Sequence, residues 1–244
     1  MRNLSVEQIQ ARYDKHQKIH DAEVDKLFGV KNLTSEQYRW LGKGYRHFAI
    51  FDIEAMAFDA RMGFMICWYN MRWDILTGER EMIYDQLEPA DMKQNYDLQR
   101  MDFDKRILQT LSEELHRADV VVGHYIQKFD LAFFAQRCHL TGQDDLVPDY
   151  MDCRFIDTWR ITKSKYNMYN SGGNSLRNAG KVIAGYDSKT SVDLQIWKTM
   201  YYVKHKKWKW ARKYICDHCE IDVNQNFDLF YKLMRRINPG GMSV

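Results

Sequence analysis

Two acidic side chains, Asp52 and Glu54, stand one residue apart at the end of the apolar run HFAIFDIE, residues 47–54. If this run is a β-strand, its side chains alternate between two faces, so residues 52 and 54 point to the same side. Desolvation and mutual repulsion both disfavour two charged carboxylates in such a position. A bound cation would neutralise them, so the pair indicates a metal site if other segments supply further acidic ligands.

Two later segments contain suitable acids. VVVGHYIQKFDLAFF places Asp130 just after an apolar strand and at the start of an expected helix. CDHCEIDVNQNFDLF places His218 and Asp222 four residues apart, which puts both on one face of a helix. Mg²⁺ and Mn²⁺ prefer oxygen ligands.

The ordered blocks FDIE, GHYIQKFD and HCEID resemble the motifs of the DEDD superfamily of 3′-5′ exonucleases, and the resemblance covers about residues 46–235. It implies an RNase H-like fold and metal-dependent removal of nucleoside monophosphates from single-stranded 3′ ends. It implies that four acids bind two divalent cations, Mg²⁺ or Mn²⁺: Asp52, Glu54, Asp130 and Asp222. It also implies that His218 handles the attacking water, since a neutral imidazole can accept or orient a proton near neutral pH.

The chain departs from the family pattern at two positions. The Asn that usually follows Gly-His is Tyr125 here, which changes the residue expected to contact the terminal nucleotide. The His-containing branch places His five residues before the last Asp, whereas His218 lies four before Asp222. His218 therefore occupies the position of the Tyr in the Tyr-containing branch, about 100° around the helix from the usual His.

Periodicity predicts an α/β fold, in which a mixed five-stranded sheet is flanked by helices. Strands are expected over residues 47–54, 63–70, 79–85, 119–124 and 154–161. Helices are expected over residues 102–118, 128–140, about 175–184 and 211–236. The first three strands should be antiparallel neighbours. The strand at 119–124 should run parallel to the first, which brings the carboxylates to one end of the sheet.

A basic segment, residues 195–214, contains seven Lys or Arg and no acid, with Trp and Tyr interleaved. Cations neutralise phosphates and aromatic faces stack on unpaired bases, so the pattern predicts a track for single-stranded nucleic acid. The residues proposed to contact nucleic acid are Tyr125, Lys198, Lys204, Lys206, Lys207, Trp208 and Lys209. The alternative is a solvated basic face whose aromatic residues lie in the core.

The composition is that of a globular protein: 45% of the 244 residues are hydrophobic, 28% are charged and the net charge is only +3. We expect an N-terminal helical arm or small subdomain over residues 1–45 and the exonuclease-like domain over residues 46–244. The five scattered cysteines favour a reducing compartment, and no run is long enough to span a membrane. These features predict a cytoplasmic protein with no membrane association.

Several alternatives remain open at this stage. Cys216 and Cys219 form a Cys-x-x-Cys pair, which is either half of a zinc site or two small core residues. DNA is favoured over RNA, although no residue pattern reads the 2′-hydroxyl. A catalytically degenerate nucleic-acid-binding protein is a further alternative. Because nothing in the chain resembles a polymerase, proofreading would require a polymerase or another replication or repair protein as a separate partner.

Overall fold

The computed structural model describes residues 33–94, 101–148, 153–166, 168, 173–185 and 193–240. Within these ranges five strands form one mixed sheet in the order β3-β2-β1-β4-β5. The strands are β1 (His47–Ala55), β2 (Met65–Asp74), β3 (Arg80–Gln86), β4 (Val120–Gly123) and β5 (Arg154–Asp157). β1 pairs antiparallel with β2 and parallel with β4, and β2 pairs antiparallel with β3, as predicted.

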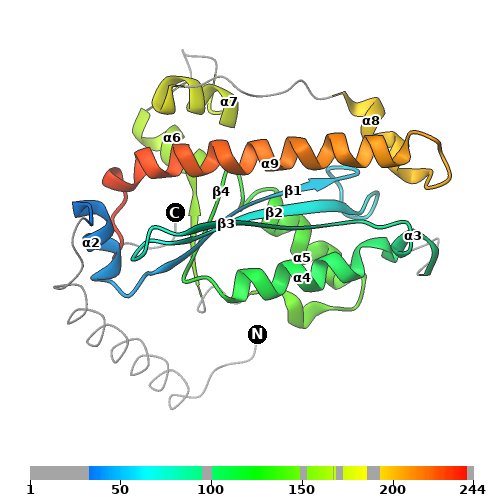
Figure 1. Ribbon diagram of the computed structural model, residues 1–244, viewed down its shortest axis with the longest axis horizontal. Helices are drawn as coiled ribbons and strands as arrows, with labels where there is room; N and C mark the ends of the chain where they lie inside the picture. The colour runs from blue at the N-terminus through cyan, green and yellow to red at the C-terminus, as the bar shows by residue number, and fades with distance from the viewer. Residues whose placement is uncertain are drawn as a thin grey trace.

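Helices cover both faces of this sheet. The α-helices are α2 (Ser35–Leu41), α3 (Asp91–Gln94), α4 (Lys105–His116), α5 (Asp130–Leu140), α6 (Thr158–Tyr166), α7 (Leu176–Ala179), α8 (Leu194–Lys198) and α9 (Trp208–Leu233). Short helical turns are η1 (Asp102–Asp104), η2 (Asp144–Leu146), η4 (Gly180–Ala184), η5 (Thr199–Tyr201) and η6 (Met234–Arg236). The long helix α9 lies along one face, and α4 and α5 cover the opposite face (Figure 1).

The alternation of side chains along the central strands divides the core into two layers. On β1, Phe48 packs against Phe230 of α9, with ring centroids 5.7 Å apart. On β2, Trp68 donates from Nε1 to the carbonyl of Ile107 in α4, at 2.9 Å. Since residues of equal parity share a face of a strand, Asp52 and Glu54 lie on the α9 side with Phe48.

The expected strand over residues 154–161 is wrong in its second half. β5 ends at Asp157, and α6 begins at Thr158. The Asp157 carboxylate accepts a hydrogen bond from the Trp159 backbone N–H at 2.9 Å, so it satisfies one of the amides left open at a helix start. Hydrophobic and β-branched residues favoured the strand, but this local capping interaction turns the chain into a helix.

The short helix expected near residues 175–184 is confirmed. The Ser175 side chain accepts from the Asn178 backbone N–H and caps the start of α7. The helical stretch continues through η4 and stops at Gly185, which has the left-handed backbone conformation (φ 85°) that glycine adopts without a steric penalty.

The N-terminal arm predicted for residues 1–45 is described only from residue 33 onward, and residues 1–32 lie outside the described ranges. α2 starts with a reciprocal capping box between Thr34 and Gln37. Its last turn buries Trp40 and Leu41 in the main core, where Trp40 lies edge-on to Phe48. The end of the arm thus packs on the sheet, and the division at residue 45 stays a prediction. No helix in the described ranges is long and apolar enough to cross a membrane.

Candidate active site

Three distant segments bring their acids together at the carboxyl end of β1. Asp52 and Glu54 lie on the α9 side of this strand and are half-buried. Asp130 is the first residue of α5, is buried, and accepts the Ile53 backbone N–H on Oδ1 at 3.2 Å. Asp222 on α9 is also buried and lines the same cavity as Asp52. The order of the sheet therefore places all four predicted carboxylates in one site.

His218 faces this acidic site from the α9 helix. Its Nε2 atom lies 3.9 Å from Glu54 Oε1 and 3.8 Å from Asp222 Oδ2. The side chain is only 4% exposed, so the imidazole is held between the two carboxylates and is screened from bulk water. Four-residue spacing on the helix thus suffices to bring both His218 and Asp222 to the site.

The electrostatics of the site favour a bound cation. Burial, followed by repulsion from Asp130, Asp222 and Glu54, raises the pKa of Asp52 well above its ordinary value. Burial raises the pKa of Asp130 to about 7, with repulsion from Asp157 and Asp222 contributing and the Ile53 N–H opposing. Asp52 and Asp130 thus resist ionisation because other acids lie close to them. A divalent cation bound here would supply the positive charge that this cluster lacks.

The donor set is chemically suited to Mg²⁺ or Mn²⁺, because all four carboxylates offer hard oxygen ligands. Among the described residues, however, no group of three or more His, Cys, Asp or Glu side chains already surrounds one point at ligand distances. Binding of an ion would therefore draw these side chains closer together.

Two neighbours of the carboxylates are not evident from sequence motifs. Trp197 on α8 donates from its indole Nε1 to Glu54 Oε2 at 3.2 Å, and its ring lies edge-on to His218 with centroids 6.0 Å apart. The Cys219 thiol on α9 lies 3.3 Å from the Asp52 carbonyl oxygen. A contact between residues 143 positions apart leaves no local pattern, so only the folded chain reveals the Trp197–Glu54 pair.

The two cysteines of the Cys-x-x-Cys pair are core residues, as one of the two alternatives stated. Cys216 and Cys219 are 3% and 0% exposed and contact the buried Cys67 on β2. Burial raises the pKa of the Cys219 thiol well above its ordinary value, and the negative charges of Asp52 and Glu54 act in the same direction. Neutral thiols in this layer pack as small hydrophobic groups rather than as metal ligands.

Tyr125 adopts an uncommon backbone conformation next to the site. Its φ of 67° lies in the left-handed region, and its backbone N–H donates to Asp157 Oδ1 at 2.9 Å. Position 123, just before this turn, requires glycine because Ile126 folds back on it. A Cβ at Gly123 would lie 2.7 Å from Ile126 atoms. The acid at the end of β5 thus fixes the loop that leads into Asp130, and such strained residues are frequent at functional sites.

Exposed aromatic rings border the carboxylates. A cavity of about 410 Å³ is lined by Asp52, His124, Tyr125, Trp159, Ser175, Leu176 and Asp222. The Tyr125 ring is 42% exposed and lies edge-on to Trp159, with centroids 5.0 Å apart. Phe58, in the loop after β1, is 85% exposed and contacts Phe129, the residue before Asp130. Large exposed aromatic side chains beside a cleft are suited to stacking on bases.

The lysines of the basic segment are exposed, whereas its predicted contact residue Trp208 is buried. The lysines proposed to contact nucleic acid all have exposed side chains: Lys198, Lys204, Lys206, Lys207 and Lys209. Trp208 is a correction, because its side chain is only 1% exposed and donates from Nε1 to the Met200 carbonyl at 3.2 Å. Its ring is part of the core and has no face available to a base. The segment continues from α8, so its lysines begin next to the residue that contacts Glu54.

His124 is a positioned, partly buried residue in the described structure. Its Nδ1 lies 2.9 Å from the Thr158 hydroxyl and its Nε2 lies 2.8 Å from the Asn174 carbonyl. The imidazole therefore ties the loop after β4 to α6 and to the residue before the α7 cap. These two contacts give His124 a structural role in holding the loop.

Comparison with known proteins identifies the class of fold. No family profile and no curated protein sequence matches the chain. Among solved structures, the chain is similar to the family B DNA polymerase from the hyperthermophilic archaeon Pyrobaculum calidifontis, with a TM-score of 0.50 and 15% sequence identity. The match covers 78% of this chain and 24% of the polymerase chain. Together with the strand order, this similarity identifies an RNase H-like α/β fold, as predicted.

Proposed function

We propose that this protein is a metal-dependent 3′-5′ exonuclease of the DEDD superfamily. The observation that carries the proposal is the meeting of four carboxylates from β1, α5 and α9 beside a buried histidine. Such a concentration of acids is unfavourable for stability unless a ligand compensates it. Perturbed acids in a cleft are a common property of active sites, which supports the same interpretation.

Asp52, Glu54, Asp130 and Asp222 would hold the divalent cations. When bound, such ions polarise the phosphoryl group, lower the pKa of a ligated water and stabilise the leaving oxygen. Asp130 is fixed in place by the Ile53 N–H, and Glu54 by the Trp197 indole, so these two oxygens are oriented before substrate arrives. This preorganisation limits the rearrangement needed in the reaction.

His218 is the candidate for handling the proton of the attacking water. Its Nε2 is within 4 Å of two carboxylates, close enough for a shared water between them. A neutral imidazole can accept a proton near neutral pH, and adjacent carboxylates would stabilise the charged form that results. Replacing His218 by Gln should therefore lower kcat more than it weakens substrate binding.

Single-stranded DNA is the proposed substrate, with RNA as the competing one. Tyr125 and Phe58 border the site with exposed rings that can stack on unpaired bases. The exposed lysines after α8 would neutralise phosphates further along the strand. The similar solved structure is a DNA polymerase, which favours DNA. A polymerase or another replication or repair protein is the proposed partner for a role in proofreading, repair or replication.

The first test is a degradation assay with 5′-labelled single-stranded DNA and RNA of one sequence, in Mg²⁺, Mn²⁺ or EDTA. We expect a ladder that shortens from the 3′ end, requires metal and appears faster on DNA. Asp52→Ala should remove it. Asp217→Ala is the matched control, because Asp217 is an exposed acid on α9 that pairs with Lys213.

Each outcome assigns a different function. A faster ladder on RNA would identify an exoribonuclease. Intact substrate in every lane, combined with measurable oligonucleotide binding, would contradict exonuclease activity and favour a degenerate nucleic-acid-binding protein. A ladder that survives in Asp52→Ala would mean that a contaminant or another site is responsible.

A further inference from the structure

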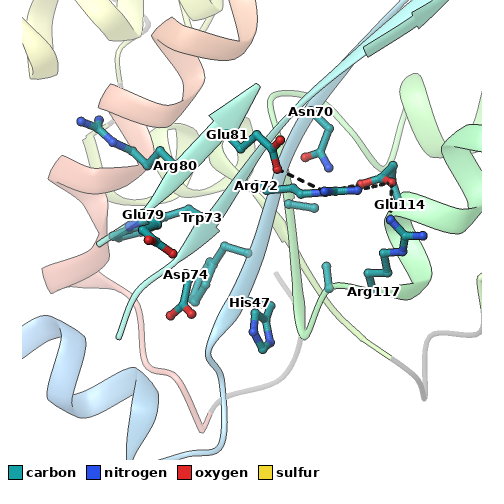
Figure 2. A pocket seen from close by; sticks show the side chains of 13 residues that line it. His47, Asn70, Arg72, Trp73, Asp74, Glu79, Arg80, Glu81, Glu114 and Arg117 are labelled. Atoms are coloured by element: carbon teal, nitrogen blue, oxygen red, sulfur yellow. Dashed lines mark hydrogen bonds and ion pairs between the residues drawn. The ribbon is translucent and has the colours of Figure 1, made fainter. Parts of the chain in front are cut away.

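A second cavity lies on the other face of the sheet and at its other end. Its volume is about 680 Å³, and it opens between the start of β1, the end of β2, the start of β3 and the end of α4 (Figure 2). Asn70 and Arg72 have the parity of Trp68 on β2, and Ala49 on β1 is paired with Arg72, so all three lie on the α4 side. Asp52 and Glu54 lie on the α9 side. This cavity is therefore separate from the candidate active site.

Asn70 lines the cavity and is 0% exposed. Within the described residues neither its Nδ2 donor nor its Oδ1 acceptor has a hydrogen-bond partner. Figure 2 shows the amide between β2 and α4, beside the Arg72–Glu114 pair. Buried amides are almost always hydrogen-bonded, because burial without a partner is unfavourable. A ligand could satisfy this amide by supplying both bonds, and because neither polar atom is exposed, the side chains that cover them must move aside when that ligand binds.

The charges around Asn70 are already compensated by one another. Arg72 forms two hydrogen bonds of 2.6 Å with Glu114 and reaches Glu81 at 3.2 Å. Arg117 also contacts Glu114, at 3.0 Å. Because the nearest cations are paired with acids, the cavity is not prepared for an anion such as a free phosphate.

We propose that this cavity binds a nucleobase, presented as a nucleoside or as a single base of a longer strand. A side-chain amide pairs with a planar group that carries a donor and an acceptor side by side, and Asn with adenine is the best-known case. Ala49 and Ala118, whose side chains are small, line the same cavity and leave room in it for a flat ring. A cavity of this size is within the range of small-molecule sites.

The test is binding of adenosine, measured by thermal shift and by NMR titration in EDTA. We expect adenosine to raise Tm and to move the assigned backbone resonances of Asn70 and Ala118 in the parent protein and in Asp52→Ala alike. This result would not depend on nuclease activity, so the site and the proposed function can fail separately. N6,N6-dimethyladenosine lacks the donor at N6 and should bind about tenfold or more weakly. Methyl riboside should give no shift.

Asn70→Leu is the decisive variant, because it keeps the approximate size and removes both polar atoms. It should abolish the response to adenosine while raising Tm of the free protein, since an unpartnered amide is replaced by an apolar group. Asn226→Leu is the matched control, because that buried amide accepts the Thr158 hydroxyl at 2.8 Å and its loss should lower Tm. Any one of three results would overturn the proposal. The resonances of the parent protein do not move on addition of adenosine, the dimethyl analogue binds with equal affinity, or the response to adenosine survives in Asn70→Leu.

Discussion

The indole of Trp197 donates a 3.2 Å hydrogen bond to Glu54, and so connects the basic segment directly to the carboxylate site. Trp197 is 5% exposed and its ring also contacts the rings of His218 and Tyr214. Trp197 therefore orients one oxygen of Glu54, a candidate metal ligand, and packs against His218, the candidate general base. Residues that orient ligands in this way typically influence metal affinity as strongly as activity.

The first prediction concerns this hydrogen bond. Trp197→Phe keeps an aromatic ring but removes the donor, so the apparent affinity for Mn²⁺ and the rate should each fall by roughly 10–100-fold. Stability should fall by about 1–3 kcal/mol, because the hydrogen bond is lost and the smaller ring leaves a cavity. Activity is measured as a function of Mn²⁺ concentration, with the exposed Trp210→Phe as control. An unchanged Mn²⁺ dependence would mean that Trp197 has a packing role only.

The second prediction concerns the stability of the metal-free protein. Because the pKa of Asp52 is raised by burial and by three neighbouring acids, its charged form is unfavourable near neutral pH. Asp52→Asn should therefore raise Tm in EDTA. It should also lower activity by at least about a hundredfold, because loss of a residue that merely supports a metal ligand already costs up to about a hundredfold. Thermal unfolding with and without Mn²⁺ provides the measurement.

Two comparisons make that result specific. Mn²⁺ should raise Tm of the parent protein and do so much less for Asp52→Asn. Asp217→Asn on the exposed side of α9 should change Tm by little in either condition, within about 0.5 kcal/mol. A lower Tm for Asp52→Asn in EDTA would show that the charged carboxylate is stabilised by the fold itself.

The third prediction concerns base stacking. Phe58 is 85% exposed, so Phe58→Ala should leave stability within about 0.5 kcal/mol of the parent protein. If an unpaired base stacks on the ring, affinity for a single-stranded oligonucleotide should fall by about 1–3 kcal/mol. Fluorescence anisotropy of a labelled oligonucleotide in EDTA tests this, with exposed Met62→Ala as control. Equal affinities for parent and variant would remove Phe58 from the substrate track.

The fourth prediction concerns the exposed lysines just before α9 and in its first turn. Replacing Lys206, Lys207 and Lys209 together by Gln should weaken oligonucleotide binding. If each neutralises one phosphate of a single strand, the slope of log K against log salt should become shallower by about 2. Binding is measured over a series of salt concentrations. A parallel line with the parent slope would assign the lysines to a solvated surface.

The fifth prediction concerns pH and the start of β1. A hydrogen bond with Asp119 raises the pKa of His47, although burial opposes this. Burial acts to raise the pKa of Asp119, but hydrogen bonds from the His47 side chain and from two backbone N–H groups outweigh it and lower that pKa. Each residue therefore favours the charged form of the other in the folded state.

The signs define the pH window of this pair. The contribution of His47 is present below its unfolded pKa of about 6.5 and is lost as pH rises through the raised value. The contribution of Asp119 is present above about 3.9 and is lost as pH falls through the lowered value. His47→Gln should therefore reduce stability most near pH 5, by about 1 kcal/mol or less because the imidazole is half exposed. Urea unfolding across pH 3–8 measures it, and a constant difference would contradict the assignment.

Local patterns were sufficient to predict much of this molecule. The apolar run HFAIFDIE predicted β1, and the alternation of side chains along a strand placed Asp52 and Glu54 on one face. Four-residue spacing predicted that His218 and Asp222 share one side of α9. Short-range periodicity carries this information because strand and helix geometry fix where neighbouring side chains point. The order of the elements then left few ways to arrange the sheet, so the convergence of the acids was also predictable.

Other features depend on tertiary structure. Trp208 is part of an aromatic and basic run, yet its ring lies in the core, because burial depends on the elements that pack on α9. The Trp197–Glu54 bond joins distant segments, and the capping role of Asp157 overrides the local preference for a longer β5. The unpartnered amide of Asn70 is visible only when β1, β2 and α4 are assembled. The sequence by itself thus determined which residues share a face, whereas only the packing of distant elements decided which are buried, exposed or in contact.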